Sequence, residues 1–151
     1  MSCYLYITGT KFDIDAFITK SKLSYSSKRY KGQPKFETKP TGEKLLRSSL
    51  SMQTSSADFN DLEKQIKDTI AYLKRNYEKL DHISSTKEIQ WAVLNFGIDL
   101  RIDKKNVFSQ SDMFPNKLLK LAGNLGLDIE LSIYPIDFDN IVAKKYKQKK
   151  K

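Results

Sequence analysis

An apolar stripe in the middle of the chain constrains the fold more than any other feature of the sequence. Its members step by three or four positions, the spacing of one helix face: Phe59, Leu62, Ile66, Ile70, Leu73, Tyr77 and Leu80. The spacing predicts an amphipathic helix of about six turns. Ser55, Ser56 and Asp58 precede it as candidate N-caps. Such a helix must bury its stripe against a second layer.

Four other segments alternate between apolar and polar residues, which is typical of strands with one buried face. They are residues 3–8, 45–53, 88–102 and 127–134. In the third segment the alternation changes phase between Val93 and Leu94, which predicts a bulge or a bend. We expect Trp91 in the core, because Ile89 and Val93 alternate with it.

Two shorter helices complete the predicted elements. Asp13 can cap one that buries Phe17, and Pro115 suits the first turn of another that Gly123 or Gly126 can end. The sequence therefore predicts an α+β fold: a two-layer sandwich with an open, mostly antiparallel or mixed sheet of about four strands and three helices. We expect one domain over residues 1–139 with an irregular arm at 24–44, followed by a disordered lysine-rich tail at 140–151.

The composition supports a packed core and a cytoplasmic location. The chain has 151 residues, of which 39% are hydrophobic, and a chain of this length buries about two thirds of its unfolded surface. A single cysteine, Cys3, cannot form an internal disulfide, which favours a reducing compartment. No run of eighteen apolar residues and no signal-peptide pattern occurs, so no membrane association is expected.

The positive charge is concentrated in two segments. Residues 20–47 carry a net +7 and residues 140–151 a net +6, so the total of +9 leaves −4 for the rest of the chain. Basic segments of this kind attract polyanions. The lysines of the tail are candidate nucleic-acid contacts: Lys144, Lys145, Lys147, Lys149, Lys150 and Lys151.

The arm interleaves aromatic and basic residues. Its candidate contacts to a partner or to nucleic acid are Tyr25, Lys28, Arg29, Tyr30, Lys31, Lys35 and Phe36. Exposed aromatics can stack on unpaired bases while basic residues neutralise phosphates. In the alternative reading, the aromatics fold back over the sheet and the lysines keep the arm soluble.

No residue pattern indicates catalysis, a metal or a cofactor. His82, the only histidine, is expected to interact with the carbonyl end of the long helix, and Cys3 is expected to be a buried, inert thiol. The pairs Asp13/Asp15 and Asp137/Asp139 could bind Mg²⁺, but we expect helix capping for the first and a solvated turn for the second, because neither pair has a companion motif. We therefore expect a protein that is not an enzyme.

Two stretches resemble a known family. They are residues 6–18, with the basic turn Lys31-Gly32 after them, and residues 114–134, a Leu-Leu helix followed by an alternating strand that ends in Tyr134. Together they look like the small bacterial proteins grouped as "domain of unknown function 4279". That family often has a Trp opening the strand after the turn, where this chain has Leu45 and Leu46. The resemblance implies a fold and a bacterial origin, and no established activity.

These observations predict a non-catalytic intracellular binding protein. One version is an immunity-type or other protein-interaction module that holds its partner against the sheet or the arm. The alternative is a nucleic-acid-binding module that uses the basic aromatic arm and the lysine tail.

Overall fold

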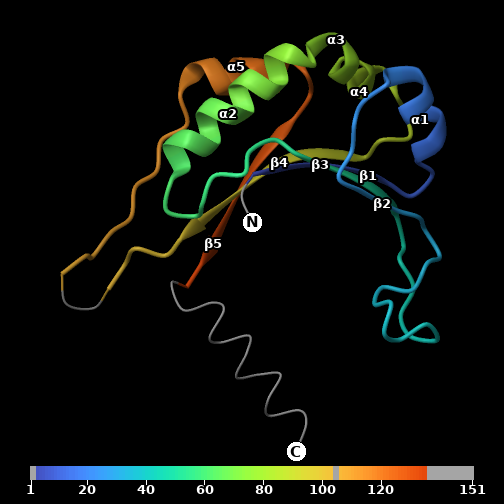
Figure 1. Cartoon of the computed structure of the whole chain (residues 1–151), viewed down its shortest axis with the longest axis horizontal. Coiled ribbons are helices and arrows are strands. Elements are labelled where there is room, and N and C mark those ends of the chain that lie inside the picture. Colours follow the sequence, from blue (N-terminus) through green and yellow to red (C-terminus); the bar gives the residue numbers. More distant parts are fainter. Residues whose placement is uncertain (1–2, 104–105, 136–151) are drawn as a thin grey trace, which may run out of the picture.

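A mixed sheet of five strands is the centre of the computed structural model, which describes residues 3–103 and 106–135. The strands are β1 (Tyr4–Gly9), β2 (Ser27–Arg29), β3 (Ser48–Gln53), β4 (Trp91–Asp99) and β5 (Asp128–Tyr134). Their order in the sheet is β2-β3-β1-β4-β5 (Figure 1). Only β5 runs parallel to its neighbour, β4, and the other pairs are antiparallel. The predicted α+β class is confirmed, with β2 as a strand that the sequence did not predict.

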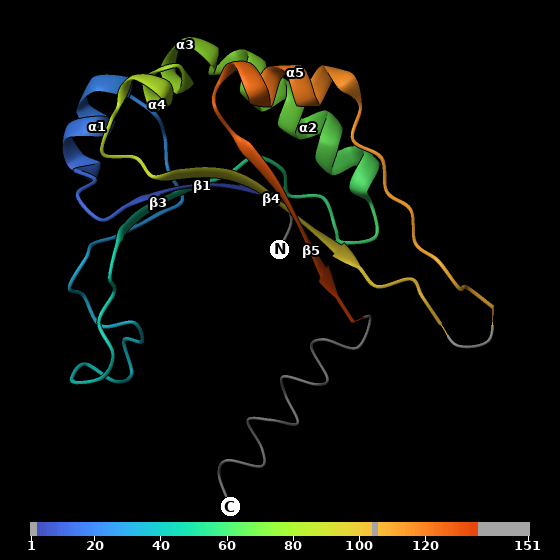
Figure 2. The ribbon, with the colours of Figure 1, turned by 180° about the vertical axis from the view of Figure 1, so that it is seen from behind.

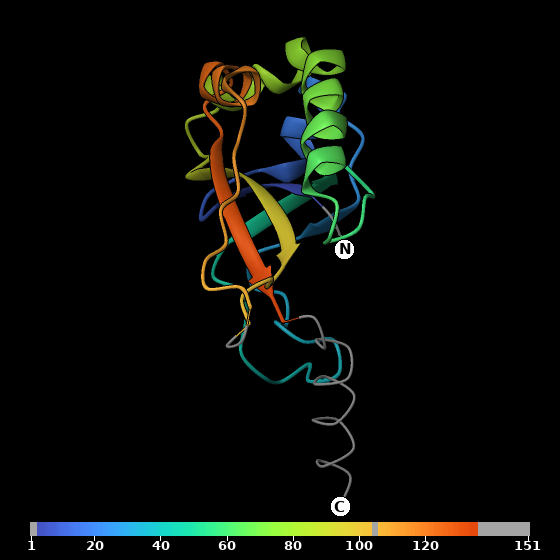
Figure 3. The same ribbon diagram turned by 90° about the vertical axis from the view of Figure 1, so that its left-hand side faces the viewer.

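The helices lie together on one side of the curved sheet, as Figures 1 and 2 show. They are α1 (Ile14–Ser21), α2 (Leu62–Arg75), α3 (Tyr77–Leu80), α4 (His82–Ser85) and α5 (Asn116–Asn124). The two longest, α2 and α5, contact each other and lie side by side in Figure 3. None of the helices within the described ranges has the length and apolar character to cross a bilayer.

The predicted six-turn helix is divided at Asn76. The side-chain amide Nδ2 of Asn76 donates to the carbonyl of Tyr72 at 3.0 Å. The backbone φ of Asn76, −108°, lies outside the helical range. Such side-chain bonds compete with the backbone ladder of a helix, so α2 ends there and α3 continues in a new direction. The N-cap is Asp61, whose Oδ1 accepts from the amide of Lys64 at 3.0 Å, and not the predicted Ser55, Ser56 or Asp58.

The predicted stripe faces the sheet and supplies much of the core. Ile66, Leu73 and Leu80 are buried, while Phe59 precedes α2 and stacks on Tyr134 with ring centroids 4.8 Å apart. The sheet contributes a matching set of side chains that are at most 1% exposed: Leu5, Ile7, Leu50, Met52, Leu94, Phe96 and Ile98. Their burial accounts for the packing of the two layers.

Strand β4 corrects two predictions. It pairs with β1 in one continuous register from Trp91 opposite Thr8 to Asn95 opposite Tyr4, so the predicted bulge is not there. Ala92, Leu94 and Phe96 point into the core in this register, which turns Trp91 to the opposite face, where it is 43% exposed. The expectation of a core Trp91 was therefore wrong, because alternation shows that a strand has two faces but not which one is covered.

Part of the predicted organisation lies outside the described residues. The tail at 140–151 with its six lysines, and the pair Asp137 and Asp139, belong to residues 136–151. The arm at 24–44 is described throughout and hangs from one end of the sheet (Figure 1).

Candidate binding face

The side of the sheet opposite the helices is covered by none of the helices or strands that the structure describes (Figure 2). Because successive residues of a strand point to opposite faces, the register decides which side chains it displays. In β1, Leu5 and Ile7 point into the core, so Tyr4, Tyr6 and Thr8 point to the open side. Their partners on the same side are Ser49, Ser51 and Gln53 of β3 and Trp91, Val93 and Asn95 of β4. We call these nine residues the open face.

Aromatic rings form a row on the open face. The rings of Tyr4 and Tyr6 are stacked, with centroids 5.9 Å apart and an angle of 20° between their planes. Trp91 lies opposite Thr8, the next outward position along β1. Tyr6 is 40% and Trp91 43% exposed. Large aromatics exposed side by side on a sheet mark a contact surface more often than a structural one.

Polar side chains fill the space around these rings. The hydroxyls of Ser27 and Ser51 are 2.9 Å apart and hydrogen-bonded. The amide Nδ2 of Asn95 donates to Glu130 Oε2 and to Ser132 Oγ, both at 2.7 Å. Partial burial, and after it the neighbouring Tyr4, raises the pKa of Tyr6, so its hydroxyl stays uncharged at neutral pH. The open face is therefore rich in groups that donate and accept hydrogen bonds.

Cations and anions lie at opposite edges of this side of the sheet. The guanidinium of Arg47 sits over the Trp91 ring, 4.2 Å from its centroid, as in a cation–π contact. Arg29 of β2 is opposite Ser49 and so points to the same side. At the other edge, Asp128 and Glu130 of β5 are exposed, opposite Val93 and Asn95. An anionic ligand is therefore favoured over β2, β3 and β1 and disfavoured over β5.

The arm is fastened to the helix layer through Asp15 of α1. Its carboxylate accepts from Lys28 Nζ at 2.8 Å and from the Tyr30 hydroxyl at 2.9 Å. These bonds, with that from Lys28 the stronger, lower the pKa of Asp15, and the bond to Asp15 raises the pKa of Lys28. Lys28 also lies over the rings of Tyr25 and Tyr30, at 5.7 and 5.5 Å from their centroids. These contacts hold the start of the arm in place.

Further bonds fold the arm back on itself. Arg29 Nη2 donates to the carbonyls of Pro34 and Lys35, at 3.3 and 2.6 Å. Lys35 pairs with Glu43 at 3.1 Å, and Pro34 forms a β-bridge with Lys44. The arm is thus an ordered hairpin-like segment, although neither strand-like side has an alternating apolar pattern.

The structure separates the predicted arm contacts. Tyr30 is partly buried against the core, whereas Tyr25 and Phe36 are 45% and 57% exposed. Lys28 points to the helix side and Arg29 to the open side, while Lys31 and Lys35 are exposed. Both readings of the arm hold in part: one aromatic packs inward, and two stay at the surface. That these residues contact a partner stays a prediction.

The sequence reasoning did not find the open face. Tyr4, Tyr6 and Thr8 alternate with Leu5 and Ile7, a pattern that predicts a strand but does not by itself show which side of the sheet is covered. Two tyrosines on the polar side of an alternating strand were the signal that could have found it.

Groups with potential chemistry have structural roles where the structure describes them. Asp13 Oδ1 accepts from the Ala16 amide at 3.0 Å and caps α1, as expected. Cys3 is fully buried, and burial raises the pKa of its thiol to about 11. His82 begins α4 beyond the end of the predicted helix and is partly buried. Within residues 3–103 and 106–135, no three His, Cys, Asp or Glu side chains gather as a metal site would require.

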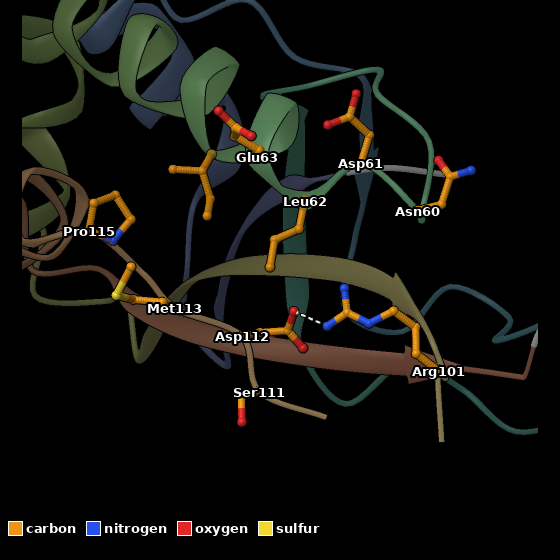
Figure 4. A pocket seen from close by; sticks show the side chains of 10 residues that line it. Asn60, Asp61, Leu62, Glu63, Arg101, Ser111, Asp112, Met113 and Pro115 are labelled. Carbon is orange, nitrogen blue, oxygen red and sulfur yellow. Dashed lines mark hydrogen bonds and ion pairs between the residues drawn. The ribbon is translucent and has the colours of Figure 1, made fainter. Parts of the chain in front are cut away.

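A hollow lies beside the start of α2 (Figure 4). It has a volume of about 490 Å³ and is lined by Leu62, Met113 and the ion pair between Arg101 Nη2 and Asp112 Oδ1, which are 2.5 Å apart. Gln110 Nε2 donates to the other oxygen of Asp112, and Asp61 caps α2. Arg101 and Asp112 bind each other, and Gln110 also binds Asp112. We therefore interpret these side chains as anchors of residues 110–112 beside residue 101.

Comparisons with known proteins found no relative of this chain. No protein-family model matches the chain, and searches of curated proteins and of solved structures returned no match. The function must therefore be argued from the surface itself.

Proposed function

We propose that this protein is a non-catalytic binding protein that holds a macromolecular partner against the open face of its sheet. The row formed by Tyr4, Tyr6 and Trp91 is the observation that supports the proposal most directly. Tyr, Trp and Arg are the residues that most often dominate the energy of binding surfaces. Here two tyrosines, a tryptophan and Arg47 lie together on one uncovered face.

The anchored arm supports the same proposal. Asp15 holds Lys28 and Tyr30 on the helix side, and carbonyls of the arm hold Arg29, so the arm and its Arg29 cation at the edge of the open face are fixed before any partner arrives. Preorganised side chains lose less conformational entropy on binding.

The resemblance to bacterial proteins and the single buried cysteine lead us to place this activity in a bacterial cytoplasm. An immunity-type role against a toxin is one form that the proposal takes. Nucleic-acid binding is the other, and the +7 charge of residues 20–47 favours it.

Site-directed photo-crosslinking in cells of the source organism tests the proposal. A benzophenone amino acid is placed at Tyr6 on the open face, and the matched control carries it at Leu119, which is 49% exposed on α5. We expect discrete high-mass adducts from position 6 and none of the same mass from position 119. Equal adduct patterns at the two positions, or none at position 6, would contradict the proposal. Nuclease or protease treatment of the adducts shows the class of the partner.

A further inference from the structure

We infer that the partner of the open face is a single-stranded nucleic acid, with its bases stacked on Tyr4, Tyr6 and Trp91 and its phosphates toward Arg29 and Arg47. The inference rests on the proposed function and names the class of its partner. It differs from binding by the arm and tail alone, because it places the nucleic acid on the sheet.

The aromatic row has the geometry of a stacking platform. Tyr4 and Tyr6 are two residues apart on β1, which is about 6.8 Å along a strand, and Trp91 lies beside the next outward position, Thr8. Tyr4 and Tyr6 cover one face of each other, and the Arg47 guanidinium covers one face of Trp91, so bases would stack on the faces that remain. Bases inside a duplex have both faces covered by neighbours, so such rings select unpaired strands.

The polar residues of the open face suit the edges of bases. Thr8 and Ser49 are partly exposed and carry hydroxyls, and Gln53 carries an exposed amide, each of which can donate and accept; Ser51 is buried, and the Asn95 amide already donates to Glu130 and Ser132. Single-strand binding modules combine stacked rings with hydrogen bonds of this kind to exposed base edges. Gln53 and Asn95 lie on either side of Tyr4 in the sheet, and Thr8 and Ser49 pair at the Trp91 end.

The charge of the surroundings fits a polyanion that follows one side of the sheet. Arg29 lies on β2 next to the arm, the Arg47 guanidinium lies over Trp91 of β4, and the acidic pair Asp128 and Glu130 lies on β5. A phosphate backbone is attracted to the two arginines and repelled from β5. The strand would therefore run along β1 and β3, with its phosphates toward the arm.

The composition of the open face argues against a protein as the partner. Val93 is the single aliphatic side chain among the nine residues that define it. The centre of a stable protein interface is more apolar than the surrounding surface. Rings, hydroxyls, amides and arginines with a single aliphatic side chain match a nucleic acid more closely.

Binding of short oligonucleotides to the full chain tests the inference. The probes are fluorescein-labelled 12-nucleotide oligo(U) and oligo(dT), and the references are a 12-base-pair DNA duplex and heparin. Trp91 is the only tryptophan, so its fluorescence reports on the open face directly. We expect both single strands to quench Trp91 and to bind more tightly than the duplex. Heparin, which has charge but no bases, is expected to leave the Trp91 emission largely unchanged.

Three variants separate stacking from charge attraction. Tyr6→Ala is expected to lose about 5- to 150-fold in affinity for oligo(U), the range of one lost stacked base. Tyr6→Phe keeps the ring and should bind within about twofold of the natural protein. Leu119→Ala on the helix side is the matched control and should not change the affinity. Circular dichroism checks that each variant folds. If Tyr6→Ala does not fold, Trp91→Leu replaces it as the variant that lacks one stacking ring, and its binding is measured by fluorescein anisotropy.

The outcomes distinguish this inference from the proposed function. Equal affinity for single strand, duplex and heparin, unaltered by Tyr6→Ala, would show attraction by the basic segments alone and overturn the inference. Absence of oligonucleotide binding at low salt, together with protein adducts crosslinked at position 6, would also overturn it but leave the proposed binding function intact. If the chain binds no oligonucleotide and position 6 gives no adducts, the inference and the proposed function are both overturned.

Discussion

At the scale of single residues, Gly97 and Gln65 join the helix layer to the sheet. The buried amide Nε2 of Gln65 donates to the carbonyl of Gly97 at 2.8 Å and to that of Asp58 at 2.9 Å. The Phe59 ring lies directly over Gly97, since a Cβ at that position would be 2.6 Å from Phe59 Cε1. The same ring stacks on Tyr134. Gly97 is therefore required by the close approach of Phe59, and its φ is not positive.

We expect Gly97→Ala to destabilise the protein by about 1–3 kcal/mol, because the methyl group would displace Phe59 from Gly97 and Tyr134. The matched control is Gly123→Ala in α5, where an added Cβ meets no atom within 4 Å. That substitution should stabilise the protein by about 0.5–1 kcal/mol, the helix preference of alanine over glycine. Urea unfolding followed by circular dichroism measures both. A Gly97→Ala variant as stable as the natural protein would disprove the close packing of Phe59.

At the scale of elements, α2 shows what determines where a helix starts. The sequence offers three polar residues before the apolar stripe as possible caps, namely Ser55, Ser56 and Asp58, and Asp61 lies between Phe59 and Leu62 of the stripe. In the structure, Asp61 caps the helix by accepting from the amide of Lys64. The hydroxyl of Ser55 donates instead to the carboxylate of Asp68, which also forms an ion pair with Lys64. The path of the loop after β3 therefore determines which residue caps α2, and this path depends on tertiary contacts and not on the local sequence alone.

Asp61→Ala should therefore cost about 1 kcal/mol of stability, because the amide of Lys64 loses its acceptor. Asp58→Ala is the control: the structure uses the backbone carbonyl of Asp58, as acceptor for Gln65, and the substitution keeps it. A change within about 0.5 kcal/mol is expected there, as for ordinary surface substitutions. Chemical denaturation midpoints of the two variants provide the comparison. Equal losses would mean that Asp61 is not the functional cap.

Local patterns predicted the elements, and long-range pairing decided the rest. The 3.6-residue stripe indicated α2, and alternation indicated β1, β3, β4 and β5, because these signals depend on neighbours in the sequence. Strand β2 has no such pattern; its three exposed residues pair with β3 through the backbone and through Ser27. The side occupied by Trp91 depended on its register with β1 in the same way. The open face could therefore not be assembled from any one segment.

At the scale of the whole molecule, the fold places its helices on one side of the sheet (Figure 2), and the strand register turns Tyr4, Tyr6, Trp91 and Arg29 to the other. The buried core extends from Cys3 to Leu127, with Leu131 packed against it. The lysines at 144–151 follow it in the sequence and add +6 to a chain whose remaining charge is +3. The proposed stacking on the open face and the proposed attraction by the basic segments are separate contributions, which a salt titration distinguishes.

Removal of residues 140–151 should leave the melting temperature within a few degrees of that of the full chain, since the core of the described residues is assembled from Cys3 to Leu131. For oligo(U) binding, each phosphate contact contributes about −0.7 to the slope of log affinity against log salt concentration. If the tail lysines contact phosphates, truncation should make the slope less steep by about 2 to 4. Tyr6→Ala should lower affinity at every salt concentration and leave the slope unchanged, because a stacked ring releases no counterion. In the truncated chain Tyr6→Ala should cost the same factor as in the full chain, since distant and independent sites are additive. A penalty for Tyr6→Ala that disappears on truncation would mean that the tail, and not the open face, holds the nucleic acid.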